Sequence, residues 1–137
     1  MKGMELRETN SKAKAFYRVP KLLYDDSRYK DLSCEAKTLY MFLLDRRQLS
    51  EMNGAKWRDE QGCVFIHYTI KELMSITNYG NKKINGLLKE LEKYQLIKKK
   101  RRGLGRANRI YVYDVMEPAG SDWKPDDDMA WLIAQYQ

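Results

Sequence analysis

The sequence predicts an α+β fold, in which helices precede a small antiparallel β-sheet. Apolar residues recur at helical spacing in residues 33–49 and again in residues 81–94, as in amphipathic helices. Residues 108–113 instead place apolar and polar side chains on alternate faces, as a half-buried strand does. Gly103 and Gly105 come just before that strand, after a basic segment, and predict a tight hairpin tip.

The composition narrows the class of protein. A length of 137 residues suits one domain with an arm or a tail. The hydrophobic content of 43% is too high for a disordered chain, and it is too dispersed for a membrane span. Residues 1–14 lack the apolar run of a secretory signal, so we expect a cytoplasmic protein with no membrane partner.

The cysteine and histidine content argues against a metal centre. Cys34 and Cys63 lack the close spacing of zinc ligands, and His67 is the single histidine. We interpret the cysteines as reduced thiols and His67 as a structural residue. No phosphate-binding loop or catalytic constellation is recognisable, so we expect neither a cofactor nor enzymatic activity.

Positive charge is concentrated in the second half of the chain. The net charge is +7, but residues 64–113 carry 12 basic and 3 acidic side chains, whereas residues 114–137 carry 1 basic and 6 acidic. A segment as basic as residues 64–113 most commonly faces a phosphate backbone. A solvated lysine face is the alternative.

The chain divides into three predicted parts. These are an N-terminal arm with a possible oligomerisation segment at residues 1–30, a folded domain at 31–113, and an acidic linker with a short C-terminal helix at 114–137. The arm ends in β-prone and apolar side chains, which we choose as the oligomer interface. They are Phe16, Tyr17, Val19, Leu22, Leu23 and Tyr24.

The folded domain is expected to begin with the helix at residues 33–49. The hydroxyl of Ser33 suits the N-cap position, where it accepts from a free backbone N–H. A turn is predicted at residues 59–62, and the β-branched and aromatic residues 64–68 predict a strand.

Two further helices are expected with a tight turn between them. Thr69 and Glu72 have the spacing of a capping box. Residues 77–80 form the turn, because asparagine and glycine tolerate positive φ, and residues 81–94 form the second helix. With the strands at residues 95–102 and 108–113, the order of elements is that of a winged helix-turn-helix.

The helix at residues 81–94 carries the predicted reading face. Its apolar side faces inward, so polar side chains at its N-terminal end can reach base edges in the DNA major groove. The predicted base-reading residues are Asn81, Lys82, Asn85 and Lys89. The residues predicted to contact phosphate or form the turn are Thr69, Asn78, Tyr79 and Lys83. Gly86 suggests close approach of DNA or a partner, and a neutral surface position is the alternative.

The basic hairpin is the predicted wing. Its glycines allow a narrow loop, from which arginines project toward a minor groove or along phosphates. The wing residues are Lys100, Arg101, Arg102, Gly103, Gly105, Arg106 and Arg109. Lysines on strands also block edge pairing, which is an alternative role for Lys98 and Lys100.

Three motifs resemble the N-terminal domain of the RepA_N-type plasmid replication initiators. They are LS-x-x-AK-x-LY at residues 32–40, W-x-D-x-x-G at residues 57–62 and GLG-x-x-N-x-IYV at residues 103–112. The resemblance covers roughly residues 16–113.

This resemblance implies sequence-specific binding of double-stranded DNA at the repeats of a plasmid origin, where replication is initiated. It also implies a homodimer or higher oligomer, and recruitment of host replication proteins through a C-terminal domain that this chain lacks. A winged-helix transcription regulator and a protein-interaction module are the alternatives that the residues leave open.

Overall fold

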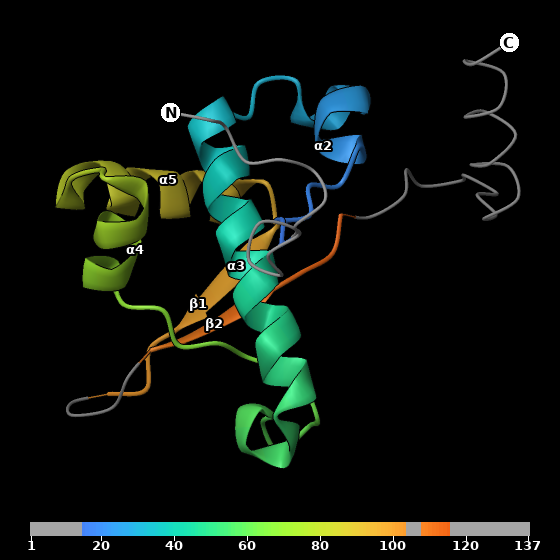
Figure 1. Cartoon of the computed structure of the whole chain (residues 1–137), viewed down its shortest axis with the longest axis vertical. Coiled ribbons are helices and arrows are strands. Elements are labelled where there is room, and N and C mark those ends of the chain that lie inside the picture. The colour runs from blue at the N-terminus through green and yellow to red at the C-terminus, as the bar shows by residue number, and fades with distance from the viewer. Residues whose placement is uncertain (1–14, 104–107, 116–137) are drawn as a thin grey trace, which may run out of the picture.

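A computed structural model describes residues 15–103 and 108–115. The long helix α3 runs through the middle of the fold, with α4 and α5 to one side of it and a β-hairpin behind it (Figure 1). In chain order the elements are α2 (Leu22–Asp25), the 3-10 helix η1 (Ser27–Tyr29), α3 (Cys34–Met52), the 3-10 helix η2 (Gly54–Trp57), α4 (Ile70–Thr77), α5 (Asn81–Lys93), β1 (Ile97–Lys100) and β2 (Arg109–Val112).

Some sequence predictions lie outside the described residues. They concern residues 1–14 of the arm, Gly105 and Arg106 in the wing, and the linker and helix expected within residues 116–137.

Helix α3 begins where its capping signal predicts. The Ser33 hydroxyl accepts from the Ala36 N–H at 3.1 Å, which confirms Ser33 as the N-cap. The helix runs three residues beyond the expected end, because nothing breaks it before Gly54, where the backbone turns to a φ of 80°.

The core lies between α3, α5 and the inner face of the hairpin. Its largest fully buried side chains come from all parts of the described chain: Tyr40, Leu23, Leu39, Leu43, Ile66, Leu73, Ile84, Leu88, Leu91 and Leu96. The Tyr40 hydroxyl donates to the Tyr113 carbonyl at 2.5 Å, and burial raises the pKa of Tyr40. This bond ties the middle of α3 to the end of β2.

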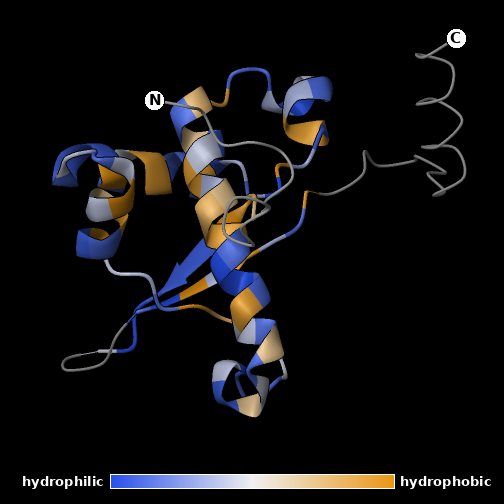
Figure 2. Ribbon diagram, in the orientation of Figure 1, coloured by the Kyte–Doolittle hydropathy of each residue, from blue (hydrophilic) through white to orange (hydrophobic). Residues whose placement is uncertain are grey.

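The sheet is a two-stranded antiparallel hairpin, in which Ile97 pairs with Val112 and Lys100 with Arg109. Its inner face carries Ile110 and Val112, both buried, while three consecutive lysines make β1 largely hydrophilic (Figure 2).

The segment at residues 64–68 is not a continuous strand, and that prediction was wrong. Val64 forms an isolated bridge with Arg58, and Ile66 forms another with Ile110. The segment therefore changes its pairing partner within two residues, so no ladder can extend along it. Its contribution to the sheet is the two bonds between Ile66 and Ile110, at 2.9 and 3.0 Å.

A short joint connects α5 to β1. Gln95 adopts a φ of 60°, which ends the helix and delays β1 until Ile97, two residues later than predicted. The buried Leu96 donates its N–H to the Leu91 carbonyl at 3.0 Å and accepts from the Tyr113 N–H at 2.9 Å. The joint is thus bonded to the helix and to the end of the hairpin.

Part of the segment assigned to the arm belongs to the folded domain. Leu23 is fully buried and Tyr29 is 5% exposed, and both lie in the core cluster. The β-prone residues 16–19 are not in a strand.

Candidate nucleic-acid interface

Helices α4 and α5 form a helix-turn-helix whose local signals match the sequence. The Thr69 hydroxyl accepts from the Glu72 N–H at 3.0 Å, and the Glu72 carboxylate accepts from the Thr69 N–H at 3.2 Å, completing the capping box. At the other end of α4, Asn78 is left-handed with a φ of 61°, as predicted for the turn.

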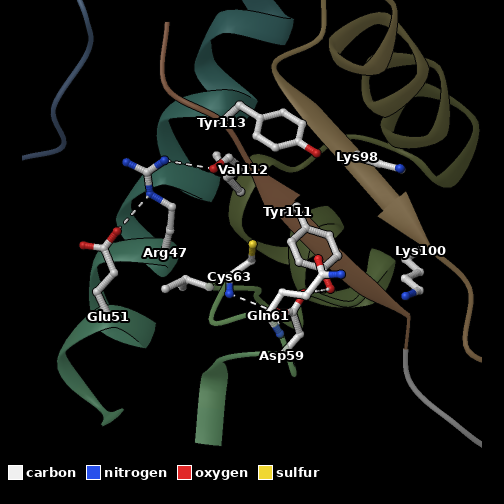
Figure 3. Close-up of a pocket in the computed structure, with 11 residues that line it drawn as sticks. Arg47, Glu51, Asp59, Gln61, Cys63, Lys98, Lys100, Tyr111, Val112 and Tyr113 are labelled. Atoms are coloured by element: carbon white, nitrogen blue, oxygen red, sulfur yellow. Dashed lines mark hydrogen bonds and ion pairs between the residues drawn. The ribbon is translucent and has the colours of Figure 1, made fainter. Parts of the chain in front are cut away.

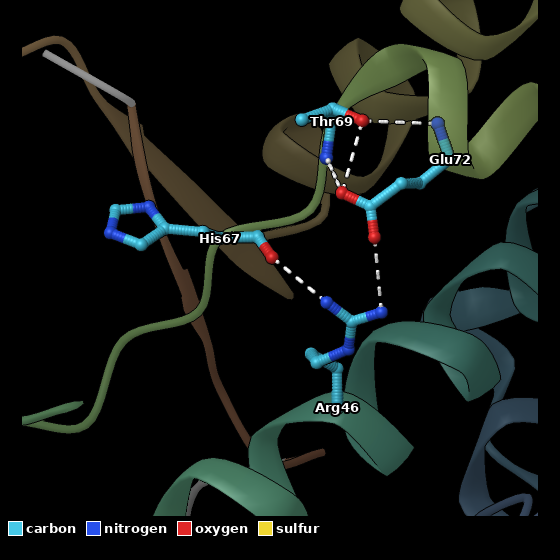
Figure 4. A network of polar contacts seen from close by, with 4 residues as sticks. All are labelled: Arg46, His67, Thr69 and Glu72. Atoms are coloured by element: carbon cyan, nitrogen blue, oxygen red, sulfur yellow. Dashed lines mark hydrogen bonds and ion pairs between the residues drawn. The ribbon is translucent and has the colours of Figure 1, made fainter.

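Arg46 holds the start of α4 against α3 (Figure 4). Its guanidinium donates to the His67 carbonyl at 3.1 Å and to the Glu72 carboxylate at 3.3 Å. The same group lies 3.9 Å from the centre of the Tyr68 ring. No local sequence pattern marks this contact, because the partners of Arg46 are 21 and 26 residues away along the chain.

Glu90 holds α5 against the start of α3. Its carboxylate accepts from the N–H and the hydroxyl of Ser33, at 2.7 and 2.9 Å. Both helices of the helix-turn-helix are therefore oriented by polar contacts to one long helix.

The two faces of α5 separate as the sequence predicts. The buried residues are Ile84, Leu87, Leu88 and Leu91. Of the predicted base-reading residues, Asn81, Lys82 and Lys89 are exposed and Asn85 is half-buried. Neither lysine forms an ion pair within the described part of the chain, so both amines remain available to DNA.

The residues predicted to contact phosphate or form the turn differ in how many contacts they make within the chain. Tyr79 packs half-buried against the core, and Lys83 places its amine 4.4 Å from the Tyr79 ring centre and 3.8 Å from a Glu35 carboxylate oxygen. Both donors of Thr69, its N–H and its hydroxyl, point to one Glu72 carboxylate oxygen. Thr69 is therefore the capping residue that its spacing to Glu72 predicts, and a phosphate contact from it stays a prediction.

The described wing residues extend the basic surface from the sheet. Lys100 and Arg101 are exposed, Arg102 is half-buried, and Gly103 has a φ of 93°. Arg109 lies at the base of the wing, where its guanidinium stacks 4.2 Å from the Phe65 ring centre. Its Nε is buried and has no hydrogen-bond partner among the described residues.

A turn beside the hairpin supports the outer face of the wing (Figure 3). One Asp59 carboxylate oxygen accepts from the Cys63 and Gln61 N–H groups, both at 2.9 Å, and the other accepts from the Tyr111 hydroxyl at 2.9 Å. The bond from the Cys63 N–H lowers the pKa of Asp59, and the Tyr111 hydroxyl and Gln61 N–H lower it further. A cavity of about 470 Å³ opens here, between Lys98 on one side and α3 on the other.

His67 has the structural role expected of it. Its Nδ1 lies 2.9 Å from the Asn108 carbonyl, and its ring packs edge-on against Trp57 and Phe65. Over residues 15–103 and 108–115, no group of three or more His, Cys, Asp or Glu side chains could hold a metal ion. None of the described helices is both long and apolar enough to cross a membrane.

The residues predicted for an oligomer interface divide into two sets. Phe16, Tyr17, Val19 and Tyr24 are exposed, with 76% of Phe16 accessible, and Leu22 is half-buried. Leu23 is corrected to a core residue, because α2 turns its side chain inward.

The fold and its exposed basic surface define a winged helix-turn-helix protein. Several solved structures share this fold, and three of them are described here. The first, described as the N-terminal domain of a DNA-binding protein, has a TM-score of 0.71 at 29% identity and covers 100% of this chain and 96% of that one. The second, a Rep–DNA complex, has a TM-score of 0.70 at 29% identity and covers 99% and 96%. The third, an MDR initiator, has a TM-score of 0.68 at 33% identity and covers 99% of each chain.

The chain belongs to the family described as Replication initiator protein A (RepA) N-terminus, whose model matches residues 15–124. A curated relative, the 41 kDa protein of Lactobacillus helveticus, is 26% identical over 127 residues. That match covers 93% of this chain and 34% of the relative, so the chain spans about a third of the relative's length.

Proposed function

We propose that this chain binds double-stranded DNA at the repeats of a plasmid replication origin, as the DNA-binding part of a replication initiator. The observation that carries the proposal is the placement of two elements. Helices α4 and α5 lie to one side of α3, and on that same side β1 ends and β2 begins (Figure 1). Membership of the initiator family and the likeness to a Rep–DNA complex support the same role.

The two elements have different tasks in this proposal. The N-terminal end of α5 enters the major groove, where Asn81, Lys82, Asn85 and Lys89 meet base edges. The exposed lysines and arginines of the wing meet phosphates beside it, which fixes the position of the protein without reading sequence. We propose a binding role with no catalytic step.

The test is a comparison of duplexes. Repeats from a candidate plasmid origin and shuffled versions of them are titrated with the 137-residue chain at physiological salt. Specific binding is expected to be about 10³-fold tighter than binding to the shuffled duplex. Equal affinity for the two duplexes would reject the proposal.

Two other functions use the same fold. A transcription regulator would make the same contacts, but membership of the initiator family does not favour it. A protein-interaction module would keep its complexes after the wing arginines are removed, whereas DNA binding would weaken.

We also propose a homodimer that forms through the exposed Phe16, Tyr17, Val19 and Tyr24. Substituting Phe16→Ser should lower the mass measured by light scattering toward that of one chain. An unchanged mass would exclude Phe16 from the interface. Host replication proteins are proposed as partners of the whole initiator, and the cytoplasm, where plasmid DNA lies, as its location.

A further inference from the structure

Asn81 and Asn85 are bonded to each other on the reading face of α5. The Asn85 Nδ2 lies 3.0 Å from the Asn81 backbone carbonyl oxygen and 2.8 Å from the Asn81 Oδ1. A backbone carbonyl can only accept, so the Asn85 atom beside it must be the amide nitrogen. The Asn81 side-chain atom beside that nitrogen must in turn be its oxygen. Hydrogen-bonding chemistry therefore fixes the orientation of both amides.

This arrangement leaves each side chain with one kind of hydrogen-bonding group to offer to DNA, a donor or an acceptor. The amide nitrogen of Asn85 has two hydrogens, and its two bonds use both. Asn85 is left with its acceptor oxygen. Asn81 keeps both hydrogens of its own amide nitrogen, because no described residue accepts them.

We propose that Asn81 and Asn85 read DNA as one donor–acceptor unit. A lone asparagine reads adenine with its own donor and acceptor together, but the donor of Asn85 is already committed. Asn85 therefore accepts from an exocyclic amino group, which in the major groove is adenine N6 or cytosine N4. Asn81 donates to an adjacent acceptor, which is a purine N7, guanine O6 or thymine O4.

The pairing also prepares the unit for binding. Two amides that are already bonded lose less side-chain freedom when DNA arrives than two independent ones. Asn85 is also half-buried, which further restricts its side chain. This inference rests on the proposed function and specifies which base classes the reading face selects.

The test is selection of bound duplexes from a randomised pool by the full 137-residue chain and its variants. Asn81→Asp keeps the oxygen that Asn85 bonds and replaces the outward donor with an acceptor. An acid in the first turn of α5 also suits the helix dipole, so the fold is preserved. Asn81→Ala and Asn85→Ala each remove one half of the unit. Ser75→Asp adds the same charge on the exposed surface of α4 and controls for repulsion of phosphate.

The expected result is a change of preference. Asn81→Asp should shift one base position toward cytosine, whose amino group suits a carboxylate, by about fivefold or more. Asn85→Ala should weaken preference at the positions facing both asparagines, and Ser75→Asp should keep the wild-type preference.

Two results would overturn the inference while the proposed function stands. One is an Asn81→Asp chain that selects the wild-type sequence at lower affinity. The other is an Asn85→Ala chain that keeps the preference opposite Asn81, which would show two independent readers. If the wild-type chain enriches no sequence, the proposed function fails and this inference fails with it.

Discussion

Ser33 and Glu90 are joined by two hydrogen bonds across 57 residues of sequence. The serine N–H and hydroxyl both donate to the Glu90 carboxylate, while the same hydroxyl accepts from the Ala36 N–H. One side chain thus starts α3 and orients α5. The angle of the predicted reading helix depends on this contact, although neither residue faces the groove in our proposal.

Glu90→Gln should lower the free energy of unfolding by about 1–2 kcal/mol, because bonds to a charged acceptor contribute more than bonds to a neutral one. Urea unfolding of the purified chain measures the change. Glu92→Gln is the matched control, since Glu92 is exposed on the same helix and its side chain forms no hydrogen bond or ion pair with the described residues. Equal losses in the two variants would contradict a specific role for Glu90.

Arg46→Lys should destabilise the start of α4. Lysine keeps the charge but cannot reach the His67 carbonyl and Glu72 together while stacking on Tyr68. The ion pair between Arg46 and Glu72 is partly exposed, so we expect the free energy of unfolding to fall by about 1 kcal/mol. Hydrogen exchange of the α4 amides should accelerate more than that of α3. Arg18→Lys, at an exposed position, is the control, and the same acceleration there would argue against the contact.

The features that sequence predicts well are those set by nearest neighbours. The Ser33 cap, the Thr69 capping box, the left-handed Asn78 and the buried stripe of α5 each follow from a few residues. The exposure of Asn81, Lys82 and Lys89 could be predicted for the same reason, because exposure on a helix follows from its apolar period.

The features that sequence did not predict depend on distant partners. The strand expected at residues 64–68 has strand-like composition, but its pairing is decided by where Arg58 and Ile110 lie. Leu23 was predicted to lie in an oligomer interface. Its burial depends on contacts with the rest of the core, which the local sequence does not show. The bond between Asn81 and Asn85 was predictable only in part. Their spacing of four residues is visible in the sequence, but the sequence does not show that Asn85 is the donor and Asn81 the acceptor.

Asp59 should make stability depend on pH. Its pKa is lowered in the folded state, chiefly by the Cys63 N–H, so its contribution is present above the ordinary aspartate pKa of 3.8 and is lost as pH falls through the lower folded value. Wild-type chain should therefore exceed Asp59→Asn in stability at neutral pH, and the difference should vanish in acid. Thermal unfolding across that range measures it. A difference that stays constant with pH would exclude the carboxylate's charge as its source.

Lys82→Ala and Arg102→Ala should weaken DNA binding in different ways. Loss of Lys82 should cost about 1–3 kcal/mol on the cognate repeat and less on random duplex, because a base contact is lost. Loss of Arg102 should weaken every duplex and reduce the slope of log affinity against log salt by about 1. Titrations at several salt concentrations separate the two. If both variants lost the same affinity on every duplex, the separate roles of Lys82 in base reading and Arg102 in phosphate contact would be rejected.

Gly86→Ala should raise stability and lower DNA affinity. A Cβ at Gly86 meets nothing within 4 Å in the free chain, and alanine favours a helix over glycine by about 1 kcal/mol. Bound DNA would bring atoms close to that position. Gly62→Ala is the contrasting variant, because a φ of 83° makes it destabilising. If Gly86→Ala binds the repeat as tightly as wild type does, Gly86 is a neutral surface position.

The joint at Gln95 and Leu96 has a consequence for the DNA rather than for the protein. Because Leu96 is bonded to Leu91 in α5 and to Tyr113 beyond β2, the helix and the wing cannot turn independently of each other. The protein therefore fixes the distance between the two segments of duplex that α5 and the wing contact. One inserted base pair would rotate one segment by about 35° relative to the other. We expect origin repeats to tolerate some changes of base but no inserted or deleted base pair. What each repeat must keep is the rotation about the duplex axis that relates its two contacted segments.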